Sequence, residues 1–169
     1  MAPSHCFEQA TTINASVSLV EYCVTDLVIM EQWLNPRLRC QPLGDHWSTQ
    51  VGARSWFSLK LPGWQPGLVS TVVERSPNTI VWTFDGFFRG QDRWQWWATG
   101  EGTELLNRFE FTIPNALVRF GFNHLATGWT KTDMISQLQR LKKLAEAQTH
   151  SPENHENQLR PSTGGGLGP

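Results

Sequence analysis

The sequence has 169 residues, of which 39% are hydrophobic and 17% are charged, and its formal net charge is −1. This length suits one domain with a sizeable core, and the balanced charge gives no indication of binding to nucleic acid or to an anionic membrane surface. No apolar run approaches the roughly 20 residues that a membrane-spanning helix needs, and the N-terminus shows no secretory signal pattern.

Cysteine and aromatic residues give the next constraints. Cys6, Cys23 and Cys40 are odd in number and widely spaced, which favours reduced thiols in a cytoplasmic protein over a disulfide framework or a zinc site. No ligand-spaced pair of histidines occurs, so we expect no metal and no cofactor. The chain has nine Trp and nine Phe but one Tyr. Tryptophan lines both protein cores and ligand cavities, so each one has a purely structural alternative.

The N-terminal part predicts a strand followed by two short helices. Residues 7–14 have strand-like composition, and Ser16 can cap the helix that follows. Apolar residues recur at helical spacing over residues 17–33, with a break expected at Asp26. Asn35 and Pro36 end the second helix.

The middle of the chain reads as six strands separated by turn residues. We expect them at residues 37–43, 51–61, 67–75, 79–85, 88–98 and 103–113. The last two form a hairpin around residues 99–102.

A long helix and a polar tail complete the chain. Pro114 starts the helix in a position that proline tolerates, and the helix continues to about Gln148. We expect residues 1–148 to form one domain and residues 149–169, which are polar and rich in Pro and Gly, to be disordered. Hairpin-linked strands followed by a helix indicate an α+β fold, in which the long helix covers one face of an antiparallel sheet.

Several short motifs follow one another in a characteristic order and spacing over about residues 6–147. The motifs are Ala15-Ser16, Val20, Asp26, Trp33 and Pro36; Val51-Gly52; Glu74 to Pro77 with Ile80-Val81-Trp82; Gly102-Thr103-Glu104-Leu105; and Leu138, Leu141-Lys142 and Ala145-Glu146. Their order and spacing resemble those of the START-like (SRPBCC) superfamily, which includes polyketide cyclase/dehydrase-like proteins, lipid-transfer domains and ubiquinone-binding chaperones. The resemblance implies a helix-grip fold, with a curved antiparallel sheet of six to seven strands wrapped around the C-terminal helix and enclosing an apolar cavity. It supplies no universal catalytic residues.

Strand alternation predicts the inner wall of that cavity. If the hairpin centres on Gly100 and Glu101, Trp96 lies opposite Leu105, Trp94 opposite Asn107, and Asp92 opposite Phe109. A turn near Phe87 would place Trp82 beside Asp92. The predicted wall consists of Trp82, Phe84, Trp94, Trp96, Phe109 and Phe111, together with the polar residues Asp92 and Asn107.

The polar candidates each have two interpretations. Asp92 is a polar handle or a general acid/base for a ligand, or it lies near the strand's start and reaches solvent or Arg89. Asn107 contacts a ligand or satisfies a buried neighbour. His124, on the inward face of the helix, is a cavity donor or a hydrogen-bonded core histidine. Gly128 is expected to leave space between helix and sheet.

Three functions remain open at this level. An apolar cavity with few polar groups favours non-catalytic binding, transport or sensing of a hydrophobic small molecule, such as a lipid, polyketide or isoprenoid-like compound. The second is a cyclase/dehydratase-type enzyme, for which Asp92, Asn107 and His124 would have to converge on one substrate. The third is an adaptor that binds a protein partner through its tail or a sheet edge.

Overall fold

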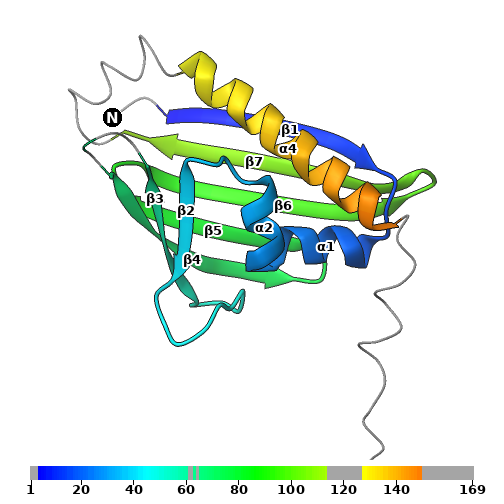
Figure 1. The fold of residues 1–169 in the computed structure, drawn as a ribbon, viewed down its shortest axis with the longest axis horizontal. Helices are drawn as coiled ribbons and strands as arrows, with labels where there is room; N and C mark the ends of the chain where they lie inside the picture. The colour runs from blue at the N-terminus through cyan, green and yellow to red at the C-terminus, as the bar shows by residue number, and fades with distance from the viewer. Residues whose placement is uncertain (1–3, 61–62, 64, 114–126, 150–169) are drawn as a thin grey trace, which may run out of the picture.

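The computed structural model describes residues 4–60, 63, 65–113 and 127–149. Its centre is one antiparallel sheet of seven strands in the order β1-β7-β6-β5-β4-β3-β2 (Figure 1). The strands are β1 (Ser4–Ile13), β2 (Leu38–Pro42), β3 (Arg54–Leu59), β4 (Gly67–Ser76), β5 (Thr79–Gly86), β6 (Arg89–Thr99) and β7 (Gly102–Thr112). Each predicted strand is present, with ends that differ from the sequence-based bounds by up to three residues.

Three described helices lie against one face of this sheet, namely α1 (Val17–Thr25), α2 (Leu27–Trp33) and α4 (Thr127–Thr149). Figure 1 shows α4 running along β1 and β7, while α1 and α2 lie toward the β6–β7 turn. The curved sheet and its C-terminal helix form the expected α+β helix-grip fold. The predicted helix start at Pro114 falls outside the described residues, as does the predicted disordered tail except for Thr149, which is the last residue of α4.

Asp26 separates α1 from α2, as the sequence predicted. Its backbone N–H donates to the carbonyl oxygen of Tyr22 at the end of α1, and its side chain accepts from the backbone N–H of Ile29 at 3.0 Å. One residue therefore ends the first helix and caps the second.

We expect Asp26→Ala to lower the free energy of unfolding by about 1 kcal/mol, because the first turn of α2 loses its side-chain acceptor. Asp26→Asn keeps an acceptor oxygen at the same place and should stay within about 0.5 kcal/mol of the parent. Urea unfolding of both variants tests this. An equal loss in the two variants would mean that the charge of Asp26, and not its cap, matters.

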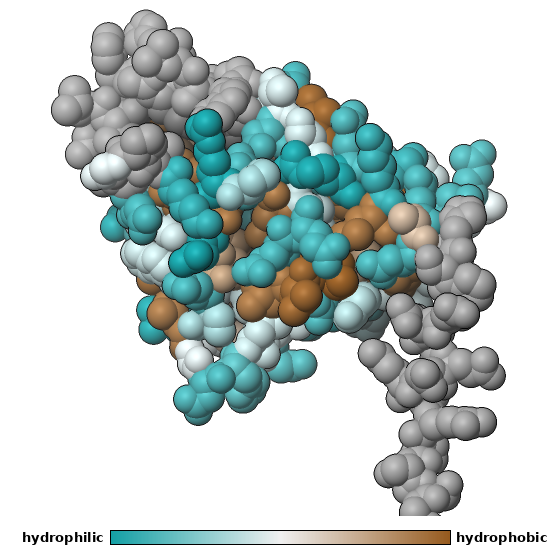
Figure 2. Space-filling model, in the orientation of Figure 1, coloured by the Kyte–Doolittle hydropathy of each residue, from teal (hydrophilic) through white to brown (hydrophobic). Residues whose placement is uncertain are grey.

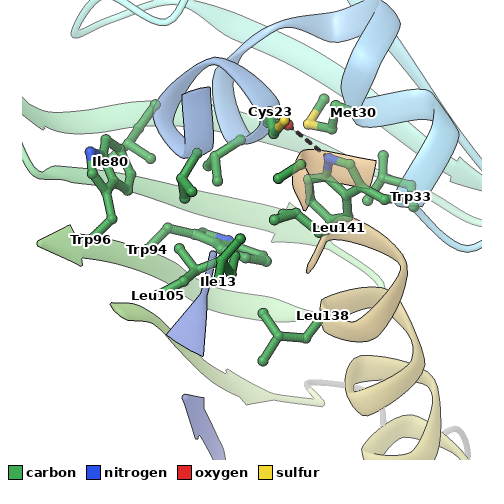
Figure 3. Close-up of a cluster of buried hydrophobic side chains, with 14 of the residues drawn as sticks. Ile13, Cys23, Met30, Trp33, Ile80, Trp94, Trp96, Leu105, Leu138 and Leu141 are labelled. Atoms are coloured by element: carbon green, nitrogen blue, oxygen red, sulfur yellow. Dashed lines mark hydrogen bonds between the residues drawn. The ribbon is translucent and has the colours of Figure 1, made fainter. Parts of the chain in front are cut away.

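The helices and the sheet enclose a core at the end of the sheet where β6 turns into β7, which we call the closed end. Figure 3 shows apolar side chains meeting there, which come from α1, α2, α4, β1, β5, β6 and β7. The labelled residues are Ile13, Cys23, Met30, Trp33, Ile80, Trp94, Trp96, Leu105, Leu138 and Leu141. All ten are at most 6% exposed, and the indole N–H of Trp33 donates to the carbonyl oxygen of Cys23 at 2.8 Å. This packing fixes α1 and α2 over the closed end.

The opposite face of the sheet carries charged side chains. Arg93 pairs with Glu74 at 3.0 Å, and Arg108 pairs with Glu8 and Glu110. These part-exposed pairs contribute little to stability. The helix-bearing side is also largely hydrophilic, with an apolar patch near its middle, where Figure 1 places α1 and α2 (Figure 2). Val28 of α2, which is 69% exposed, is one of the exposed apolar residues.

Candidate functional site

The concave face of the sheet carries a second apolar cluster at the end away from the β6–β7 turn. We call this the aromatic end. It consists of Phe84, Phe111 and Ile113, which are buried, and of Phe7, Leu68, Phe88 and Phe109, which are partly buried. Strand alternation explains the grouping, because Phe7 lies opposite Phe109 in the β1–β7 ladder and odd-numbered residues of β7 all face this side.

The phenyl rings of the aromatic end form a continuous wall. Phe84 stacks on Phe109 with ring centroids 5.2 Å apart, although the two strands that carry them lie on either side of β6. Phe109 contacts Phe111 at 5.1 Å, and Phe88 contacts Phe111 at 4.9 Å. Gly90 of β6, opposite both Phe84 and Phe111, adds no side chain to this wall. A Cβ there would lie 1.9 Å from the carbonyl oxygen of Glu110, so this position requires glycine.

A polar network borders the aromatic end on its side toward the core. The side-chain amide of Asn107 donates to Asp92 Oδ1 at 2.6 Å, and the indole N–H of Trp94 donates to Asp92 Oδ2 at 2.8 Å. Asn107 also donates to the carbonyl oxygen of Arg93 at 3.3 Å. Each carboxylate oxygen therefore has one neutral donor among the described residues.

Burial raises the pKa of Asp92 from 3.8 to about 6, and the hydrogen bonds from Trp94 and Asn107 only partly oppose this rise. A carboxyl group in apolar surroundings disfavours its charged form, whereas donors to that form stabilise it. Burial is the larger effect here. Asp92 thus titrates close to neutral pH, within the range useful for proton transfer and for pH-dependent binding.

The structure confirms the predicted strand register residue by residue. Trp96 lies opposite Leu105, Trp94 opposite Asn107, Asp92 opposite Phe109, and Trp82 beside Asp92. The alternative role of Asp92 as a partner of Arg89 is wrong, since Arg89 pairs with Asp85 at 2.7 Å. The structural interpretation of Asn107 is confirmed, because its amide satisfies Asp92.

The other predicted wall residues divide between the two clusters. Trp82, Trp94 and Trp96 belong to the larger core, whereas Phe84, Phe109 and Phe111 belong to the aromatic end. Trp96 is completely buried. His124 lies outside the described residues. Gly128 lies in the first turn of α4, and the side chains of that turn are also outside the described part of the structure.

Sequence reasoning missed Phe7 and Phe88. Phe7 could have been found by pairing the first strand with the last one, since alternation then sets it opposite Phe109. Phe88 could have been found by extending the alternation of the predicted strand at residues 88–98, which places it on the same face as Asp92 and Trp94. A groove of about 310 Å³ also lies between β1 and α4, lined by Gln9, Ala10, Thr11, Ile135, Leu138 and Gln139.

The described part of the chain contains neither a cluster of metal-ligand residues nor a candidate membrane-spanning helix. No group of three or more His, Cys, Asp or Glu side chains among these residues could hold a metal ion. None of the described helices combines the length and apolarity needed to cross a membrane.

The fold and the apolar concave face define a START-like (SRPBCC) protein. The family model for polyketide cyclase/dehydrase and lipid transport matches residues 4–146. The chain belongs to this family. No curated protein matches it.

Solved structures with this fold are similar at low sequence identity. The Zhui aromatase/cyclase from Streptomyces sp. R1128 has a TM-score of 0.71 at 13% identity, covering 88% of this chain and 98% of that one. A protein from Thermus thermophilus has a TM-score of 0.67 at 16% identity, covering 87% and 99%. An uncharacterised protein from Rhizobium leguminosarum has a TM-score of 0.67 at 10% identity, covering 87% and 97%. At such identities the likeness concerns the fold.

Proposed function

We propose that this protein binds a hydrophobic small molecule against the aromatic end of its sheet, as a carrier or sensor. The observation that carries the proposal is the wall of phenyl rings on the concave face, bordered by the carboxyl group of Asp92. Ligand sites in proteins are mostly apolar with a few placed polar groups, and this wall has that composition. The family's description, which includes lipid transport, supports the same class of ligand.

The two clusters differ in a way that supports this location. The core at the closed end is filled by side chains from α1, α2 and α4, whereas Phe7, Phe88 and Phe109 at the aromatic end stay partly exposed. Partly exposed phenyl rings that face the same side can contact an apolar ligand without disrupting the core. We also propose that the protein is cytoplasmic, because Cys6, Cys23 and Cys40 are free thiols.

A second candidate is a cyclase/dehydratase-type enzyme, which Asp92 favours through its position beside the wall and its pKa of about 6. A carboxyl group that titrates near neutral pH can act as a general acid or base. In that case Asp92→Asn should lower turnover by roughly 10²- to 10⁴-fold while binding persists. A carrier would show no turnover to lose.

The proposal is tested with Nile red, an uncharged dye whose emission rises in apolar surroundings. We expect the wild-type protein to bind it and Phe109→Ala to weaken binding by about tenfold or more, because burial of roughly 100 Å² of ring surface contributes about 2.5 kcal/mol. Native mass spectrometry of the purified protein provides an independent measurement, in which a co-purified apolar molecule is expected.

Leu106→Ala is the matched control for Phe109→Ala. Leu106 is also an apolar residue of β7, but alternation places it on the opposite face of the sheet. It should leave dye binding unchanged. Equal losses in the two variants, or no dye binding by the wild type, would overturn the proposed location.

A further inference from the structure

Asp92 is the only acidic residue that the registers of the seven described strands place on the concave face. The other acids of these strands, Glu8, Glu74, Asp85, Glu104 and Glu110, alternate onto the opposite face. Asp92 also stands at a boundary, because its direct neighbours across the sheet are Trp82 on β5 and Phe109 on β7. In the ladder, this acidic residue therefore stands between a tryptophan and a phenylalanine on the same face.

No cation in the described part of the chain compensates this carboxyl group. The ion pairs of these residues involve other acids: Arg89 pairs with Asp85, Arg93 with Glu74, and Arg75 with Glu21. The remaining pairs are those of Arg108 with Glu8 and Glu110 and of Lys142 with Glu146. Among these residues, the side chains of Asn107 and Trp94 donate hydrogen bonds to Asp92, and both are neutral.

A carboxylate with two neutral donors keeps capacity for more. Its two oxygens accept about four hydrogen bonds in total, and the described residues supply one to each oxygen. A part-buried charge to which the described residues offer no counter-ion is unfavourable, so a ligand that brings a positive charge gains more here than it would in water. Asn107 and Trp94 hold the carboxylate in place and thus reduce the reorganisation that binding would need.

The neighbouring rings suit the same kind of ligand. A cation above the face of an aromatic ring is attracted by the ring quadrupole, most strongly by tryptophan. Trp82 and Phe109 flank Asp92, and Phe84 stacks on Phe109 at 5.2 Å. The wall can therefore contact both an apolar body and a charged nitrogen attached to it.

We infer that the ligand of this site is a hydrophobic amine, whose protonated nitrogen binds the Asp92 carboxylate while its apolar part lies on the phenyl rings of the aromatic end. This inference rests on the proposed function, because it assumes that the aromatic end binds a small molecule. It adds a charge preference that an apolar wall alone does not have.

The test compares two probes of nearly equal shape, naphthylethylamine and naphthylethanol, in displacement of Nile red at about pH 7.5, where the amine is protonated and Asp92 is ionised. We expect the amine to bind about 10- to 100-fold more tightly than the alcohol, as for a charge-assisted hydrogen bond. Asp92→Asn should reduce this preference to about threefold or less while keeping affinity for the alcohol. Binding of the alcohol also shows that Asp92→Asn is folded. If Asp92→Asn does not fold, Asp92→Ser is used in its place.

Asp85→Asn is the matched control, because it removes one negative charge from the neighbouring strand at a side chain that is 68% exposed. It should leave the amine preference intact. Equal affinity of the wild type for amine and alcohol, with Nile red still bound, would overturn the amine inference and leave the proposed function standing. If neither probe nor the dye binds, both fail together. A preference that survives in both Asp92 variants would also overturn the inference, since another acid would then hold the amine.

Discussion

Trp94→Ala is expected to lower the free energy of unfolding by about 3–5 kcal/mol, the usual range for truncating a large buried aromatic side chain. Trp94 is 6% exposed and its ring lies 5.4 Å from that of Trp33, so the deletion leaves a cavity where β6 meets α2. It also removes one of the two donors to Asp92, which leaves a carboxylate oxygen without its protein partner. Urea unfolding followed by circular dichroism measures the loss.

Trp97→Ala provides the control on the same strand. Trp97 is 42% exposed and faces the opposite side of β6, so its removal should change stability by no more than about 0.5 kcal/mol. A comparable loss in the two variants would mean that the β6 ladder itself, and not the burial of Trp94, determines the effect. Trp94→Phe should recover part of the lost packing but not the hydrogen bond to Asp92.

The register of the sheet could be predicted from the sequence because three local signals agreed. The hairpin turn at Gly100 and Glu101 fixed the pairing of β6 with β7, and the turn near Phe87 fixed that of β5 with β6. Alternation along β7 then placed Leu105, Asn107 and Phe109 on one face. A slip of one residue would have exposed this whole set, so the apolar pattern and the turns constrain each other.

The contacts of Asp92 could not be predicted with the same method. Alternation gives the face of a residue, but the hydrogen bonds of Asp92 with Asn107 and Trp94 depend on side-chain rotamers. Likewise, pairing of β1 with β7 joins residues about 100 positions apart, and no turn specifies it. Phe7 therefore entered the site only with the structure.

The stability of the protein should fall as pH rises through about 6, relative to that of Asp92→Asn. The pKa of Asp92 is raised from its ordinary value of 3.8 to about 6 in the fold, so between these values the native state binds more proton than the unfolded chain. Stability decreases with pH wherever the native state binds more proton. The loss of stability caused by ionised Asp92 is absent below about pH 4 and complete above about pH 6. Two pKa units correspond to about 3 kcal/mol, which is an upper value for this part-buried group.

Urea unfolding of wild type and Asp92→Asn at several values between about pH 4 and pH 8 measures the effect, because the other titrating groups are common to both proteins and cancel in the difference. We expect wild type to lose stability relative to the variant by about 1–3 kcal/mol across this range. Asp85→Asn, which alters an exposed surface pair, should follow wild type within about 0.5 kcal/mol. Parallel curves for wild type and Asp92→Asn would mean that water reaches the carboxylate freely. Added naphthylethylamine should flatten the wild-type curve, because a cation bound at Asp92 stabilises its ionised form, whereas naphthylethanol should leave the slope unchanged.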